Sequence, residues 1–135
     1  MYGDSKIFNL TVWDVVVGLC IRGALVSATG IRGDSVGKHL VQIVTNGGQH
    51  ILTDLDCDFG MESIVAIGEE GANCEVKNLN INGIHGRAGA AHLYDARIEN
   101  SEITAEDIIP GKEHEYGVIS IYPNCSLNGG ILTIN

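Results

Sequence analysis

The feature that most constrains the fold of this 135-residue chain is a repeat of about 24 residues. Short segments with alternating apolar residues recur along the chain, and each opens with a small or polar residue suited to a tight corner. The opening residues are Asn9, Gly30, Asp54, Asn78, Asn100 and, approximately, Asn128. Further period-2 segments precede and follow the openings, which leaves no room for a helix in the unit. A repeat of this length predicts a solenoid, in which one unit cannot bury its apolar face alone but stacked units can.

We expect each unit to form one coil of three short strands, with inward side chains stacked on the next coil about 4.8 Å away. The strand after each opening then supplies two inward columns, Leu19/Val41/Val65/Ala91/Ile119 and Ile21/Ile43/Ile67/Leu93/Ile121. The fold class predicted is all-β, with five to six coils in a single domain over residues 1–135. A β-sandwich also suits short strands and turns, but the regular spacing of the openings argues against it.

The corner residues carry a family resemblance. Ile or Val, one intervening residue, Asn and then alternating Leu or Ile is a pattern that resembles the right-handed parallel β-helix superfamily of pectate and pectin lyases and phage tailspikes. In that family one corner of each coil often carries Asn, and stacked copies form a hydrogen-bonded ladder. Asn9, Asn78 and Asn100 match that position, Asp54 and Asn128 are variants of it, and Gly30 departs from it. The resemblance implies the fold, and an extracellular or virion-surface setting, more than it implies a reaction.

Charge and hydropathy limit the partners. The chain has 17 acidic against 8 basic residues and a formal net charge of −9, which repels phosphate backbones, so we expect no nucleic acid partner. The first residues lack the basic and apolar regions of a signal peptide. The most apolar stretch, residues 15–28, contains Arg22 and is shorter than the roughly 20 residues of a membrane helix. We therefore expect no membrane partner.

The four cysteines show neither a CxxC pair nor a metal-ligand spacing, so we expect packed free thiols. Cys74 and Cys125 occupy the same place in their repeats with Ala96 between them. That puts the two sulfurs two coils apart, which is too far for a disulfide.

A candidate carbohydrate site follows from the resemblance, because in that family saccharide lies in a groove along the strand that follows each opening. The outward positions of this strand, and the loops expected at residues 82–87 and 104–115, bring aromatic, basic and acidic side chains toward one patch. Its members are His85, Arg87, His92, Tyr94, Glu113, His114, Glu115 and Tyr122. Tyr94 and Tyr122 should stack in successive coils and offer flat apolar faces with polar tips, which suit sugar rings. The alternative is an aromatic ladder that only stabilises cross-strand packing.

Catalytic residues are not assigned. Glycoside hydrolysis usually needs two carboxylates at a set separation, whereas Glu113 and Glu115 share one loop and the facing strand offers no acidic partner. The pectate-lyase relatives use an Arg base and Ca²⁺ held by acidic residues, for which only Arg87 or Arg22 is at hand. If the chain is an enzyme, we expect a polysaccharide lyase or a glycoside hydrolase.

No metal or other cofactor is expected. An outward stripe of Asp54, Asp56 and Asp58, with Glu102, Asn80 and Asn82 on later coils, offers hard oxygen ligands that suit Ca²⁺. Alternating Asp is also typical of a solvated face that resists aggregation, and this is our interpretation. His39 and His50 have no evident partner and are expected at the surface or at corners.

The predicted function is a carbohydrate-engaging β-helix of the tailspike, adhesin or polysaccharide-processing type, with a polysaccharide or glycan as partner. The alternative is a structural solenoid segment that self-assembles or acts as a spacer. The repeats begin and stop within strands, and open strand edges favour association, so we expect a homo-oligomer or part of a longer chain.

Overall fold

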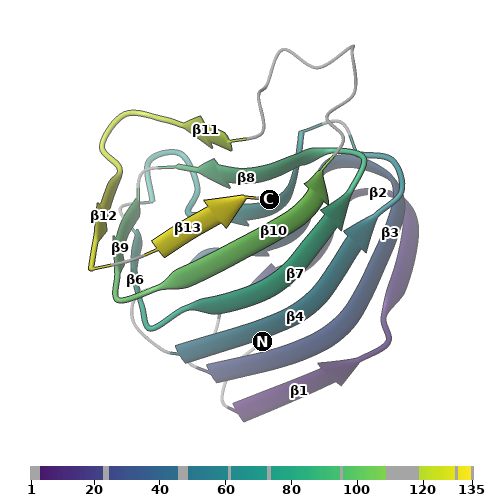
Figure 1. Ribbon diagram of the computed structural model, residues 1–135, viewed down its shortest axis with the longest axis horizontal. Helices are drawn as coiled ribbons and strands as arrows, with labels where there is room; N and C mark the ends of the chain where they lie inside the picture. Colours follow the sequence, from purple (N-terminus) through teal and green to yellow (C-terminus); the bar gives the residue numbers. More distant parts are fainter. Residues whose placement is uncertain are drawn as a thin grey trace.

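A computed structural model describes residues 4–22, 25–45, 49–60, 62–72, 74–94, 96–108, 119–129 and 131–134. These residues form a parallel β-solenoid in which the strands of successive coils lie side by side (Figure 1). The strands are β1 (Asp4–Phe8), β2 (Thr11–Ile21), β3 (Leu25–Ile43), β4 (Gln49–Cys57), β5 (Ser63–Ile67), β6 (Cys74–Lys77), β7 (Asn80–Gly86), β8 (Gly89–Leu93), β9 (Ala96–Glu99), β10 (Glu102–Ile108), β11 (Ile119–Ile121), β12 (Ser126–Asn128) and β13 (Ile131–Ile134). None of the described segments is a helix able to cross a membrane.

All strand pairs are parallel, as a chain that winds repeatedly in one direction requires. The large sheet has the order β11-β8-β5-β3-β4-β7-β10-β13, with β1 and β2 also paired to β3. The small sheet has the order β12-β9-β6. The predicted all-β parallel solenoid is therefore confirmed. It has about four turns rather than five to six, because β2, β3, β5, β8 and β11 stack in five layers and four turns connect five layers.

The two predicted core columns are confirmed residue by residue. Along β2, β3, β5, β8 and β11 the register pairs Leu19–Val41–Val65–Ala91–Ile119 and Ile21–Ile43–Ile67–Leu93–Ile121. In the middle coils these side chains are fully buried, as at Ile43 and Ile67. Burying one such side chain contributes about 1.5–3 kcal/mol, so the columns supply much of the energy that holds the coils together.

The corner residues differ from the single ladder that the repeat predicts, because they form two separate columns. Positive φ angles occur at Asn9, Gly30 and Asp54 in the first coils and at Asn78, Asn100 and Gly129 in the last coils. The backbone amide of Asn78 donates to the carbonyl of Glu99, and that of Asn100 to Asn128, so the second column is continuous. Asp54, however, lies opposite Gly83 and not opposite Asn78.

The two columns exist because the third side of the coil changes along the solenoid. From Cys74 onward each coil has the expected third strand, and β6, β9 and β12 form the small sheet. The segments that precede the openings Asn9 and Asp54, residues 6–8 and 50–52, belong instead to the large sheet, where Ile51 pairs with Asn80. The corner at Asn78 thus follows a third strand, whereas Asp54 lies within β4.

Two predicted loops contain strands. Residues 80–86 form β7, with a register irregularity where it pairs with β10, so the expected loop at 82–87 is mostly strand. The expected loop at 104–115 begins as the continuation of β10 to Ile108, and its later part lies outside the described residues.

The cysteine prediction agrees with the register. Cys74 pairs with Ala96 in the small sheet, and Ser126 pairs with Arg97, so one coil separates Cys74 from Cys125. The four cysteines are thiols and not disulfides.

We expect Gly86→Ala to destabilise the solenoid far more than Gly71→Ala. Both glycines have positive φ, 134° and 77°, and alanine at Gly71 should cost about 1–2 kcal/mol of left-handed strain. At Gly86 a Cβ would also collide with the backbone carbonyl of Cys57 on the neighbouring coil, whereas Gly71 faces open space. Urea unfolding should give Gly86→Ala a free energy of unfolding several kcal/mol lower than that of Gly71→Ala. Equal losses would contradict the close approach of β7 and β4.

Candidate functional site

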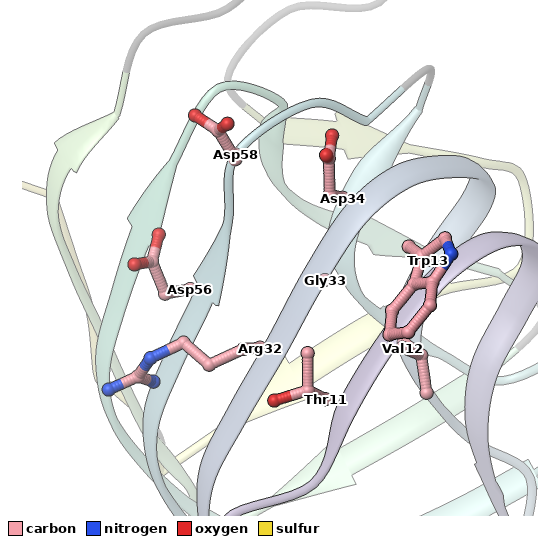
Figure 2. A pocket seen from close by; sticks show the side chains of 8 residues that line it. All are labelled: Thr11, Val12, Trp13, Arg32, Gly33, Asp34, Asp56 and Asp58. Atoms are coloured by element: carbon pink, nitrogen blue, oxygen red, sulfur yellow. The ribbon is translucent and has the colours of Figure 1, made fainter.

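One groove of about 300 Å³ lies on the large sheet beside the exposed indole of Trp13. Figure 2 shows this indole on one side of Gly33 and the carboxylates of Asp56 and Asp58 on the other. We call it the tryptophan groove; its lining residues are Thr11, Val12, Trp13, Arg32, Gly33, Asp34, Asp56 and Asp58. The structure thus adds Trp13 and Arg32 to part of the predicted acidic stripe.

Asp54, the third member of that stripe, is held by two neighbours. Its Oδ2 accepts a hydrogen bond from Nη2 of Arg32 at 2.7 Å, and its Oδ1 lies 3.0 Å from Nε2 of His85. The hydrogen bond from Arg32 is the largest influence that lowers the pKa of Asp54. This carboxylate, on β4, therefore links β4 to Arg32 on β3 and to His85 on β7.

A second groove, of about 470 Å³, lies beside the later part of β3 and the residues that flank β5 and β8. We call it the tyrosine groove; its lining residues are Val16, Val17, Lys38, His39, Gln42, Glu62, Glu69, Glu70, Tyr94 and Tyr122. Tyr94 follows β8 directly and Tyr122 follows β11, so the parallel register brings them together. Their ring centroids are 4.5 Å apart with an angle of 18° between the planes, which confirms the predicted stack.

Two histidine rings pack beneath the tyrosines. His39 and His92 are 5.4 Å apart edge to face, and each lies within 6 Å of the Tyr94 ring in the same arrangement. The hydroxyl of Tyr94 lies 3.3 Å from Nδ1 of His92, 3.2 Å from Nε2 of His39, and 3.4 Å from the Glu62 carboxylate to which it donates. Edge-to-face aromatic contacts and these polar contacts fix the rings in place.

Burial governs the titration of this cluster. It lowers the pKa of His39 to about 3, with the adjacent His92 and Lys38 adding repulsion, and lowers the pKa of His92 to about 4. Burial, followed by the charge of Glu62, raises the pKa of Tyr94. At neutral pH the cluster therefore holds two neutral imidazoles and a neutral phenol.

The structure brings together three of the predicted site residues, His92, Tyr94 and Tyr122. His85 lies instead on β7, where it contacts Asp54. Arg87 is exposed at the corner between β7 and β8, and none of its described contacts joins it to the tyrosines. Glu113, His114 and Glu115 lie outside the described residues.

The prediction that His39 and His50 lie at the surface or at corners is wrong. Both are buried, and His39 belongs to the tyrosine groove together with Glu62, a residue to which the sequence analysis gave no role. The repeat length could have indicated that His39 and Glu62 are neighbours. His39 lies 24 residues, one repeat length, before Ser63, so it stacks beside the start of β5, next to Glu62. His50 faces the core, and neither of its ring nitrogens has a hydrogen-bond partner in the described part of the chain.

Comparison of the chain with protein-family models, with curated proteins and with solved structures finds no match.

We expect the protein to lose stability as the pH falls below about 6.5. His39 and His92 have lowered pKa values in the folded chain, so the unfolded chain binds more protons in this range and stability rises with pH. The free energy of unfolding should fall by about 1.4 kcal/mol per pH unit for each histidine, until the pH reaches the folded pKa values near 4 and 3. Urea unfolding at several pH values measures the slope, and NMR titration identifies the rings. Rings that titrate near pH 6.5 in the folded protein would contradict this prediction.

Proposed function

We propose that this chain is a carbohydrate-binding β-solenoid that holds a saccharide in the tyrosine groove. The observation that carries the proposal is the stacked Tyr94–Tyr122 pair on the wall of an open groove. The hydroxyl of Tyr94 contacts Glu62 and the histidines, whereas Tyr122 directly follows β11, the last strand of its column, and stays partly exposed. Tyr122 is therefore the ring that we expect to contact a sugar face.

Hydrogen-bonding groups from several successive coils surround the aromatic pair. Gln42 lies one coil before Ala66 and two coils before His92, and its amide nitrogen donates to the carbonyl of Gly68. Glu69 and Glu70 are exposed at the rim. An apolar platform with a few polar groups around it is the usual composition of a small-molecule site.

The charge of the groove favours a neutral or amino sugar over a uronic acid. Three lining residues carry carboxylates, Glu62, Glu69 and Glu70, against the single ammonium of Lys38. Glu69 is partly balanced by Arg22 at 3.3 Å, but both side chains are about half exposed, so this pair is weak. Since the whole chain is also acidic, an anionic polysaccharide would be repelled.

The second candidate function is a structural one, and the side chains of the last coil favour it. Ile121 and Leu127 continue the inward positions of Leu93 and Ile98, yet they are 66% and 39% exposed. The strands that carry them, β11 and β12, have one unpaired edge each within the described sheets. A second copy of this chain that packed on this coil would cover both the apolar side chains and the strand edges.

We expect Tyr122→Ala to weaken saccharide binding at least about tenfold, which corresponds to about 1.4 kcal/mol. The probes are neutral, amino and uronic acid oligosaccharides in a calorimetric titration, with binding expected for the first two classes. Phe59→Ala, which removes another exposed aromatic side chain, is the matched control and should bind as the wild type does. No binding by the wild type, or equal losses in both variants, would refute the proposal.

The structural candidate predicts that sedimentation depends on protein concentration. Leu127→Lys should then shift the equilibrium toward the monomer, because it places a charge on the exposed last coil. Ile51→Lys changes an equally apolar side chain on the flank of the solenoid and should leave the association unchanged. A wild-type protein that stays monomeric at all concentrations would exclude self-assembly through this coil.

A further inference from the structure

Four polar atoms converge at the floor of the tyrosine groove, from three successive coils. They are Nε2 of His39 on β3, Oε2 of Glu62 before β5, Nδ1 of His92 on β8 and Oη of Tyr94 after it. Oη lies 3.2 to 3.4 Å from the other three atoms. Oε2 lies 3.7 Å from Nε2 of His39 and 3.8 Å from Nδ1 of His92, and these three ligand atoms are all within 4.8 Å of one another.

A hydrogen-bond chain sets the tautomer of His39. Ser63 Oγ donates its single proton to the carbonyl of Val65 at 2.9 Å and lies 2.8 Å from Nδ1 of His39. Nδ1 must therefore donate to Ser63. Nε2 then carries no proton, and its lone pair is available to the other three atoms. Metal-binding histidines are held in this way, with the second ring nitrogen bonded to the protein.

His39 and Glu62 present two acceptors to a single hydroxyl proton. The hydroxyl of Tyr94 has one proton for the Glu62 carboxylate at 3.4 Å and for Nε2 of His39 at 3.2 Å, so one of these two acceptors is left without it. His39 is almost fully buried and Glu62 keeps only 19% of its side chain exposed, so water solvates these acceptors poorly. A protonated His39 would supply the missing donor, but burial opposes the charged ring. A cation bound between the four atoms would satisfy the acceptors of His39 and Glu62 together.

The spacing suits one class of cation. Four ligands about 2.1 Å from a tetrahedral zinc ion stand about 3.4 Å from one another, and the contacts around Oη already have this length. The Glu62–histidine distances need to close by a few tenths of an ångström, and the two histidine nitrogens, which lie within 4.8 Å of each other, need to reach the same separation of about 3.4 Å. We propose that His39, His92 and Glu62, with the Tyr94 hydroxyl at the fourth vertex, form a binding site for a divalent transition-metal ion of the zinc type.

The ligand atoms of this site favour a different metal ion from those of the acidic stripe of Asp54, Asp56 and Asp58. Imidazole nitrogens suit zinc and its transition-metal neighbours, whereas Ca²⁺ and Mg²⁺ take oxygen ligands. All four residues are in or beside the tyrosine groove, three of them lining it, so an ion can reach them from solvent. The proposal does not depend on saccharide binding, because Tyr122 is not among the four ligands.

The test uses Zn²⁺ and Co²⁺ with the full chain under reducing conditions. Competition with a chromogenic chelator should show one Zn²⁺ bound per chain, and Zn²⁺ should raise the thermal unfolding temperature relative to the protein in chelator. Co²⁺ should give the intense visible absorption of a tetrahedral complex, without a sulfur-to-cobalt band. Phe59→Ala, which removes an exposed aromatic side chain that does not line the tyrosine groove, should bind both ions as the wild type does.

Glu62→Gln keeps the size and the acceptor oxygen but removes the charge, and we expect it to weaken Zn²⁺ binding at least about tenfold. Its matched control is His85→Gln, since His85 also lies 3.0 Å from a carboxylate but belongs to no three-ligand group among the residues that the structure describes. Should Glu62→Gln fail to fold, Glu62→Asp tests the same ligand with a shorter side chain and should also weaken binding. The proposal is overturned if the wild type takes up no Zn²⁺, if cysteine sulfur supplies the ligands, or if His85→Gln loses as much affinity as Glu62→Gln.

Discussion

The parallel hydrogen-bond register between coils is the constraint on which the rest of this structure depends. Each strand is paired to the strand one coil away, so a residue's place in its own coil decides which side chains lie above and below it. Isoleucine therefore stacks on isoleucine in the core, and Tyr122 stacks on Tyr94 outside it. A shift of one residue would turn an apolar column outward, which is why the buried middle coils hold a single register.

The repeat length and the period-2 alternation were sufficient to predict the solenoid, its core columns and the tyrosine stack. They were not sufficient to place the corners. Asn and Asp adopt left-handed backbone at any tight corner, so the sequence alone gives no means of telling Asp54, a bend within a strand, from Asn78, which follows a third strand. A spacing of 24 residues joins these two positions in the sequence, but the structure places Gly83 beside Asp54.

The candidate site was partly predictable for a similar reason. Tyr94 and Tyr122 share a column, and a column follows from spacing. His39 and Glu62 belong to different columns and to earlier coils. They reach the tyrosines through side chains whose direction depends on local packing. Burial of a histidine is also unexpected from its polarity, and it becomes understandable only when the hydrogen bond to Ser63 and the contacts with Tyr94 are known. His50, buried with no such bond in the described residues, shows that the column periodicity can place a polar ring in the core.

The distribution of the groove residues over several coils has an evolutionary consequence. Solenoids change length readily by duplicating or deleting whole repeats, since each repeat contacts only its neighbours. The side chains around Tyr94 come from β3, from the residue before β5 and from β8 in turn, so removal of the coil that contains Glu62 would join β3 directly to the coil of His92 and leave the carboxylate out. Selection on this groove would thus preserve the number of repeats at the centre of the chain, while the flanking repeats remain free to vary in number.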